Sequence, residues 1–412
     1  SQGTHAADAT LRVAESNYEL GNKEISLEWY QKIVDNYPDS PLVKDAVRGK
    51  IWALNDLKRF DEAEKVGKDY INKYKTDPTY DIAAAEIQMK LAEVKFDDQN
   101  YLAAADEYLH VISDYSDLPK FDTFKSRALL QAGLAYYNEA ERNNWDAGLL
   151  QKSADVSAQL IDKYEKNFDK EKREFETRIG DVTAGILNMG LSYSKMKQYE
   201  KAIEAYKIMP KGNPEYGKAV FLMGQAYSDS GKVDESVAAY RSMVNDKSLS
   251  ETWRSRAAIE LATRLREAKR FSEAIVEYQK TIEDYSKSEF VPTAIYYIGS
   301  SYYDIEPRTP ENMDKAIEAF NKVLTQYPNA AEIVPWAQYG ILMAYEAKGA
   351  YDMVVKLAEE IEAKYAESTA PEAKRVIDLA RKQKVDAMQK LETGVAPDVL
   401  IAELRKVVAD PM

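Results

Sequence analysis

Apolar residues recur along the chain with the period of an amphipathic α-helix, in short blocks separated by turns. Between residues 218 and 230 they fall at i, i+3, i+4 and i+7, which places them on one helix face, and after Gly231 the same spacing restarts. The residues at these positions are Val220, Met223, Gly224, Tyr227, Val233, Val237, Tyr240 and Val244. This stretch therefore predicts two helices joined by a tight turn.

The same pattern of helix, turn and helix recurs along most of the chain. The segment around Gly190 repeats it 34 residues before Gly224. A small residue marks one position of the second helix in nine units, at Ser26, Ala63, Ala104, Ser153, Ala202, Ser236, Ala274, Ala316 and Val354. Because a repeat of roughly 20 to 50 residues is typical of stacked helix pairs, we expect an all-α solenoid of about nine pairs over residues 1–370.

The repeated residue types resemble those of the tetratricopeptide repeat (TPR). Gly190 and Tyr193 stand at the glycine and tyrosine positions of a first helix, and Ala202 and Tyr206 at the small and aromatic positions of a second helix. The resemblance implies a right-handed α-α superhelix, with the first helices lining its concave face and small residues where two helices approach closely.

Two units and one connection depart from this pattern. Gly67 stands where the second unit should have an aromatic residue, and the fourth unit carries Ser153 and Ser157 on a weak second helix, so the boundaries there are expected to be irregular. Residues 304–313 contain Pro307 and Pro310, which break the helical pattern and predict a surface loop.

The two ends of the sequence also differ from the repeats. Residues 371–412 lack the repeat pattern, and two helical stretches at about 371–391 and 397–408 are expected to form a solubilising cap. Residues 1–11 correspond to the start of a first helix that elsewhere follows Tyr-Pro-Asp-Ser, as at residues 37–40. We therefore expect the sequence to be a fragment of a longer array.

The amino-acid composition argues against several classes of active site. The chain has no cysteine and only two histidines, His5 and His110, which argues against thiolate, metal and most nucleophile–histidine sites. Residues 212–218 fit a phosphate-loop pattern, but Ala219 replaces the Ser or Thr that holds magnesium, so we expect a turn between repeats. The prediction is a non-enzyme with no catalytic residue, cofactor or metal.

The net charge and the hydropathy of the chain limit the kinds of binding partner that we expect. A net charge of −13 repels phosphate backbones, so nucleic acid is not an expected partner. No apolar run reaches the roughly 18 to 20 residues needed to cross a bilayer, so no membrane span is expected. A neutral or basic protein or peptide suits this acidic chain best.

Many second helices end in Tyr-Pro or Tyr-Ser, as in residues 33–38, 111–116 and 323–328. This style is similar to bacterial cell-envelope TPR proteins, such as the lipoprotein of the outer-membrane β-barrel assembly machinery and the periplasmic TPR partner of the Tol-Pal system. Their lipidated cysteine is absent here. The resemblance implies a periplasmic or outer-membrane-associated protein, and a cytoplasmic location is the alternative.

Family geometry assigns the second, fifth, ninth and twelfth repeat positions to the concave face. The positions carried over are Leu130, Leu134, Tyr137, Phe221, Gln225, Tyr296, Ser300, Tyr303, Tyr339 and Met343. Tyrosines beside small polar residues suit a peptide anchor, although the same side chains could instead pack against neighbouring helices.

The function expected from this pattern is a non-enzymatic scaffold that docks a partner segment on the concave face. The alternative is a helical accessory array of a glycan- or peptidoglycan-acting enzyme. Self-association through the uncapped first repeat is a further expectation.

Overall fold

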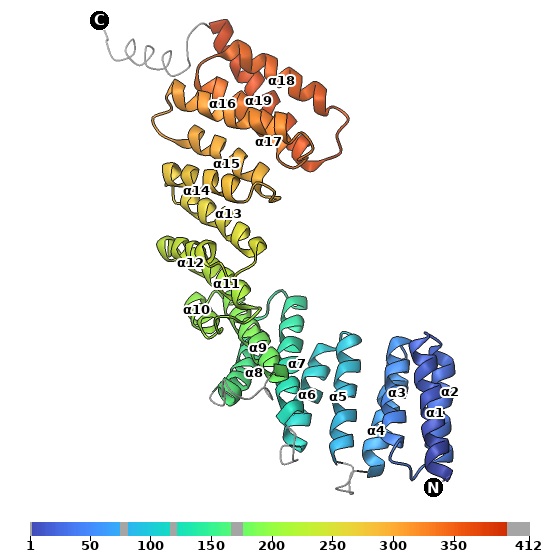
Figure 1. Ribbon diagram of the computed structural model, residues 1–412. Helices are drawn as coiled ribbons and strands as arrows, with labels where there is room; N and C mark the ends of the chain where they lie inside the picture. Colours follow the sequence, from blue (N-terminus) through green and yellow to red (C-terminus); the bar gives the residue numbers. More distant parts are fainter. Residues whose placement is uncertain (1, 75–80, 116–121, 166–175, 394–412) are drawn as a thin grey trace, which may run out of the picture. The chain divides into compact units, whose positions relative to one another are not determined.

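A computed structural model describes residues 2–74, 81–115, 122–165 and 176–393 of the chain. These residues form nineteen α-helices and no β-strand (Figure 1). The helices follow one another as nine pairs, in which the odd-numbered helices α1 to α17 are the first helices and the even-numbered α2 to α18 are the second helices; α19 follows. The predicted all-α class and the number of pairs are confirmed.

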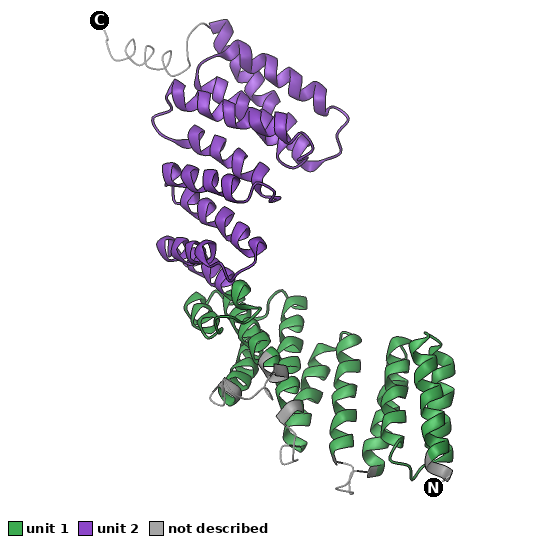
Figure 2. Ribbon diagram, in the orientation of Figure 1, with its two compact units in different colours: residues 1–219 green, residues 220–412 purple. Residues whose placement is uncertain are grey.

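The chain divides into two compact units, residues 1–219 and 220–412, with the boundary inside α11 (Figure 2). The helices up to this boundary are α1 (Gln2–Glu19), α2 (Lys23–Asn36), α3 (Val43–Asp56), α4 (Phe60–Tyr74), α5 (Asp81–Asp97), α6 (Tyr101–Asp114), α7 (Asp122–Arg142), α8 (Ala147–Glu165), α9 (Glu176–Lys195) and α10 (Tyr199–Lys207). The others are α11 (Tyr216–Asp229), α12 (Val233–Asn245), α13 (Glu251–Glu267), α14 (Phe271–Asp284), α15 (Val291–Asp304), α16 (Pro310–Gln326), α17 (Val334–Ala347), α18 (Tyr351–Tyr365) and α19 (Pro371–Thr393).

Within each unit a helix packs mainly on the helices next to it in the chain, and a first helix also contacts the next first helix, as α3 contacts α5 and α15 contacts α17. All nine small residues predicted on the second helices are fully buried. On the facing first helix, a Cβ added to Gly224 would lie 2.8 Å from the ring of Tyr240, and one added to Gly190 would lie 2.3 Å from Tyr206. Close approach of paired helices therefore explains the repeat.

The turn within a pair is also repeated. Seven described turns place one residue in the left-handed region, at Gly21, Lys58, Gln99, Lys197, Gly231, Lys269 and Gly349. In each, that residue and the next donate backbone hydrogen bonds back into the first helix; in the sixth pair, Gly231 donates to Ser228 and Lys232 to Tyr227, both at 2.9 Å. These two hydrogen bonds form a Schellman cap, which ends each first helix at the same point.

The two atypical units form regular helices, with other residues filling the space. A Cβ on Gly67 would lie 2.6 Å from Leu91 of α5, so a leucine from the next pair occupies the room that an aromatic ring takes elsewhere. In α8, the Ser153 hydroxyl donates to the Gly133 carbonyl at 2.8 Å, and the Asn188 amide donates to Ser153 at 2.9 Å. Buried hydrogen bonds therefore join α7, α8 and α9 in this unit.

The predicted loop at 304–313 is shorter than expected. Thr309 accepts a hydrogen bond from the backbone N–H of Asn312 at 3.2 Å and caps α16, whose first residue is Pro310. Proline lacks only an N–H that the first helical turn leaves unpaired, so Pro310 starts this helix rather than breaking it.

The first predicted capping stretch is α19, which packs on α17 and α18. The second, at 397–408, lies outside the described residues. Across the part of the chain that the structure describes, no helix is both long and apolar enough to cross a bilayer.

Candidate functional site

The second unit brings side chains of successive first helices into contact. Arg266 of α13 donates to the Ser300 hydroxyl at 2.7 Å and to the Asp304 carboxylate at 2.9 Å, both on α15. Its guanidinium lies 5.2 Å from the ring centre of Tyr297. These groups are partly exposed, so a polar bridge between neighbouring pairs is accessible from solvent.

Further side chains of α15 and α17 extend this surface. Tyr303 of α15 is partly exposed, and the Arg308 guanidinium lies 4.6 Å from its ring centre. Partial burial raises the pKa of the Tyr303 hydroxyl, with Glu346 of α17 adding to the rise. Glu346 in turn accepts from the ammonium of Lys390 on α19 at 3.3 Å. We call the group Arg266, Ser300, Tyr303, Asp304 and Glu346 the first-helix strip.

Helix α19 packs beside the last two predicted anchors. Tyr339 lies edge-on to Trp336, with ring centres 6.5 Å apart, and Tyr339 and Met343 both pack on the cluster that includes Ile377 of α19. Both side chains remain partly exposed. They therefore combine packing against a C-terminal helix with some accessible surface.

Two predicted anchors belong to the core. Phe221 is 6% exposed and packs on Tyr240 and Trp253, with ring centres 5.4 and 5.8 Å apart. Leu130 is 8% exposed within the apolar cluster around α7. In these two cases the side chain packs between helix pairs, because a neighbouring ring or helix covers it.

The other predicted residues are more accessible. Gln225 is exposed; Leu134 and Tyr137 are partly exposed on α7, and the Tyr137 ring lies 5.6 Å from that of Trp145. Tyr296 lies 5.5 Å from the ring of Phe320 and is mostly covered. The ten residues therefore divide between the units, with three on α7 and seven on α11, α15 and α17.

Sequence reasoning missed Arg266 and Asp304. Arg266 occupies the twelfth repeat position of the seventh unit, the position that Tyr303 occupies in the eighth, and no residue of the seventh unit was assigned to the concave face. Extending the assignment to that unit would have found the arginine. The bond to Asp304 depends on how two pairs stack, and no spacing within one repeat reports it.

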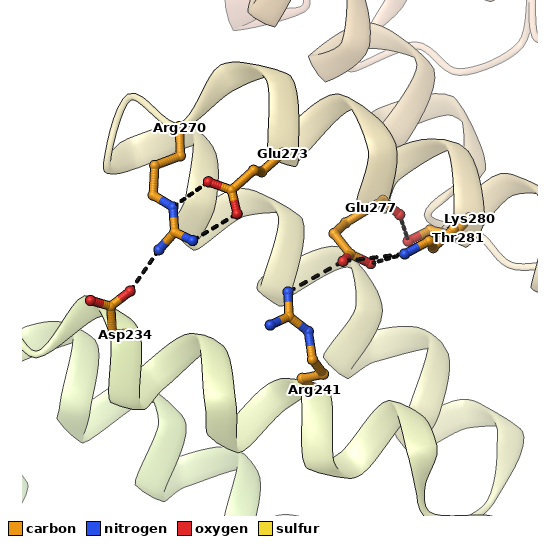
Figure 3. Close-up of polar contacts among 7 residues, drawn as sticks. All are labelled: Asp234, Arg241, Arg270, Glu273, Glu277, Lys280 and Thr281. Carbon is orange, nitrogen blue, oxygen red and sulfur yellow. Dashed lines mark hydrogen bonds and ion pairs between the residues drawn. The ribbon is translucent and has the colours of Figure 1, made fainter.

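Second helices are joined by a separate set of ion pairs (Figure 3). Arg270 binds Glu273 through two hydrogen bonds of 2.7 Å and reaches Asp234 of the preceding second helix at 2.6 Å. Arg241 reaches Glu277 at 3.3 Å across the same boundary. These ion pairs are contacts between the sixth and seventh repeats.

Within the described residues, no group of three or more His, Asp or Glu side chains is arranged to hold a metal ion.

Comparison with known families identifies the repeats. One tetratricopeptide repeat model matches residues 8–40 and 293–330, and a second matches residues 187–249. These ranges fall on α1 and α2, on α15 and α16, and on α9 to α12. No curated protein matches the chain by sequence.

Solved structures share the helical repeat at low identity. The MamA protein is 25% identical over 46% of this chain and 97% of its own, with a TM-score of 0.36. Yeast Tom70 is 11% identical over 97% of this chain and 99% of its own, with a TM-score of 0.37. The apo form of RapI is 11% identical over 94% and 99%, with a TM-score of 0.45.

Proposed function

We propose that this chain, which carries tetratricopeptide repeats, is a non-enzymatic scaffold that docks a segment of a partner protein on the concave face lined by its first helices. Proteins built from such repeats generally mediate protein–protein interactions, through extended surfaces formed by stacked pairs. The observation that carries the proposal is the first-helix strip, in which Arg266, Ser300 and Asp304 join two pairs and leave Tyr303 accessible.

The chemistry of the strip favours a neutral or basic segment. Arg266 is already paired with Asp304, so it has little unsatisfied charge for an acidic ligand. Asp304 and Glu346 are both partly exposed, on a chain whose net charge is −13. Tyr303 adds a ring and a hydroxyl at low cost in side-chain entropy, which suits an anchor for a peptide.

We place the protein in the bacterial cell envelope, in the periplasm or at the outer membrane. The support is the style of the repeats, in which second helices end in Tyr-Pro or Tyr-Ser. Fractionation of the native source followed by immunoblotting tests this. Recovery with periplasmic and membrane markers is expected, and recovery with cytoplasmic markers would contradict it.

Site-specific photo-crosslinking tests the docking surface. A photoreactive amino acid replaces Tyr303 in the full chain, expressed in its native source, and a matched variant carries it at Glu318, an exposed position of second helix α16. We expect a protein crosslinked through position 303 and absent at position 318. Its recovery should fall at least tenfold with Asp304→Asn at unchanged helical content, because this substitution removes a carboxylate that favours a basic segment. Equal crosslinking from both positions would place the contact elsewhere.

A further inference from the structure

A groove runs between the second helices α2 and α4 of the first unit, with α3 as its floor. It consists of two adjoining hollows of about 530 and 210 Å³, which share Gln31, Lys50 and Val66. Leu27 and Leu54 contribute apolar wall to the first hollow, and the second adds valines from α2 and α3. The groove is therefore part apolar and part polar, and it lies on first-unit helices, apart from the first-helix strip.

The floor of this groove carries a cation with a neutral partner. Lys50 is partly buried and donates to the side-chain oxygen of Gln31. The Gln31 amide nitrogen is itself bound to Asp35 at 2.7 Å. Among the described residues, no carboxylate lies within ion-pair distance of the Lys50 ammonium, and burial lowers its pKa. Asp35, Glu62 and Asp69 favour the Lys50 charge only from beyond that distance. This half-buried ammonium is therefore incompletely compensated, because burial disfavours the charged form.

Each end of the groove has an exposed carboxylate, beside Lys32 in the first hollow and Lys73 in the second. Glu28 of α2 lines only the first hollow and Asp69 of α4 only the second, so they flank Lys50 along the groove. Both side chains are exposed, and within the described ranges neither side chain makes a hydrogen bond or an ion pair. Arg59, which also lines the first hollow, is already bound to Glu24 at 3.0 Å and Glu62 at 2.6 Å.

We propose that this groove docks a segment of a partner protein in which one Asp or Glu stands between two Lys or Arg residues. The central carboxylate pairs with the Lys50 ammonium, and the flanking cations pair with Glu28 and Asp69. The aliphatic parts of the segment lie on the apolar walls. The acidic ends disfavour polyanions such as nucleic acid, so the order of charges selects a segment of alternating sign.

Three synthetic peptides test this order of charges on the full wild-type chain. They are fluorescently labelled, capped at both ends, and read K-L-E-L-K, K-L-Q-L-K and K-L-K-L-K, with binding measured by fluorescence anisotropy. The glutamate peptide is expected to bind at least tenfold more tightly than the other two, which corresponds to about 1.4 kcal/mol. Equal binding of all three, or binding of none up to about 1 mM, would overturn the proposal.

Two variants locate the site. Lys50→Met keeps the length of the side chain and removes its charge, and it should abolish the preference for glutamate. Lys65→Met, at an exposed position of α4 outside the groove, is the matched control and should keep the preference. Glu28→Gln combined with Asp69→Asn should weaken binding of the glutamate peptide at least fivefold. Retention of the preference in a folded Lys50→Met protein would also overturn the proposal.

Discussion

Single residues act in this protein mainly by filling the space where two helices meet. The buried tyrosine of the second helix packs its ring against a small residue of the first helix, while its hydroxyl finds different surroundings in different pairs. The Tyr278 hydroxyl lies 3.1 Å from that of Thr263. The Tyr240 hydroxyl is buried without a hydrogen-bond partner in the described part of the chain. The repeat therefore depends on the ring, and the hydroxyl is incidental.

This difference predicts opposite effects for the same substitution. Tyr278→Phe should lower the free energy of unfolding by about 1 kcal/mol, because it removes the hydrogen bond to Thr263, whose hydroxyl keeps its bond to the Ile259 carbonyl. Tyr240→Phe should leave it unchanged or raise it by up to about 1 kcal/mol, because it removes an unpaired buried hydroxyl. Urea denaturation followed by circular dichroism measures both, and a larger loss for Tyr240→Phe would contradict the assignment.

Glycine at the contact gives a second prediction. Gly224→Ala should destabilise the protein by about 1 to 3 kcal/mol, since the new Cβ would lie 2.8 Å from the buried ring of Tyr240. Gly180→Ala in α9 is the control, because its Cβ would meet nothing within 4 Å. There alanine should stabilise the helix by up to about 1 kcal/mol. If the two variants change the free energy of unfolding equally in thermal unfolding, the Tyr240 ring moves aside for the new methyl group, which would contradict the prediction.

At the scale of helices and turns, the repeated unit is the first helix with its cap. The left-handed position carries glycine in three of the seven capped turns and a long polar residue in the other four. All seven make the same backbone hydrogen bonds, so the cap holds the left-handed conformation even where the residue disfavours it.

Lys269→Gly should therefore raise the free energy of unfolding by about 0.5 to 1 kcal/mol, because glycine adopts a φ of 60° without strain. Gly231→Ala should lower it by about 1 kcal/mol in the equivalent turn of the preceding pair. Thermal unfolding of the two variants beside the wild type is the measurement. A destabilising Lys269→Gly would mean that its side chain contributes more than the backbone strain costs.

At the scale of the whole molecule, stacking of pairs buries tyrosines in both units. Desolvation is the largest cause that raises the pKa of Tyr30, to about 12, and it also raises the pKa of Tyr108, Tyr206, Tyr240 and Tyr278. A raised pKa means that the folded state favours the neutral phenol. The stability from this source is complete below the ordinary value of 10.0 and is lost as the pH rises towards the folded values.

We therefore expect alkaline unfolding above about pH 10. The helical signal at 222 nm should fall together with the appearance of tyrosinate absorbance from these buried residues, whereas exposed tyrosines ionise first. Paired titrations by circular dichroism and ultraviolet absorbance provide the measurement. Complete ionisation of all tyrosines with the helical signal intact would contradict the burial described here.

The repeat pattern of the sequence predicts the all-α class, the nine pairs and the small residue of every second helix, because a close helix crossing needs a small side chain wherever it recurs. It also places Tyr303 on a first helix. The burial of Phe221, the bridge from Arg266 to Asp304 and the position of Lys50 in a groove follow from the folded structure alone. The exposure of a side chain and its hydrogen-bond or ion-pair partners depend on residues of other repeats. The pattern within one repeat does not specify those residues.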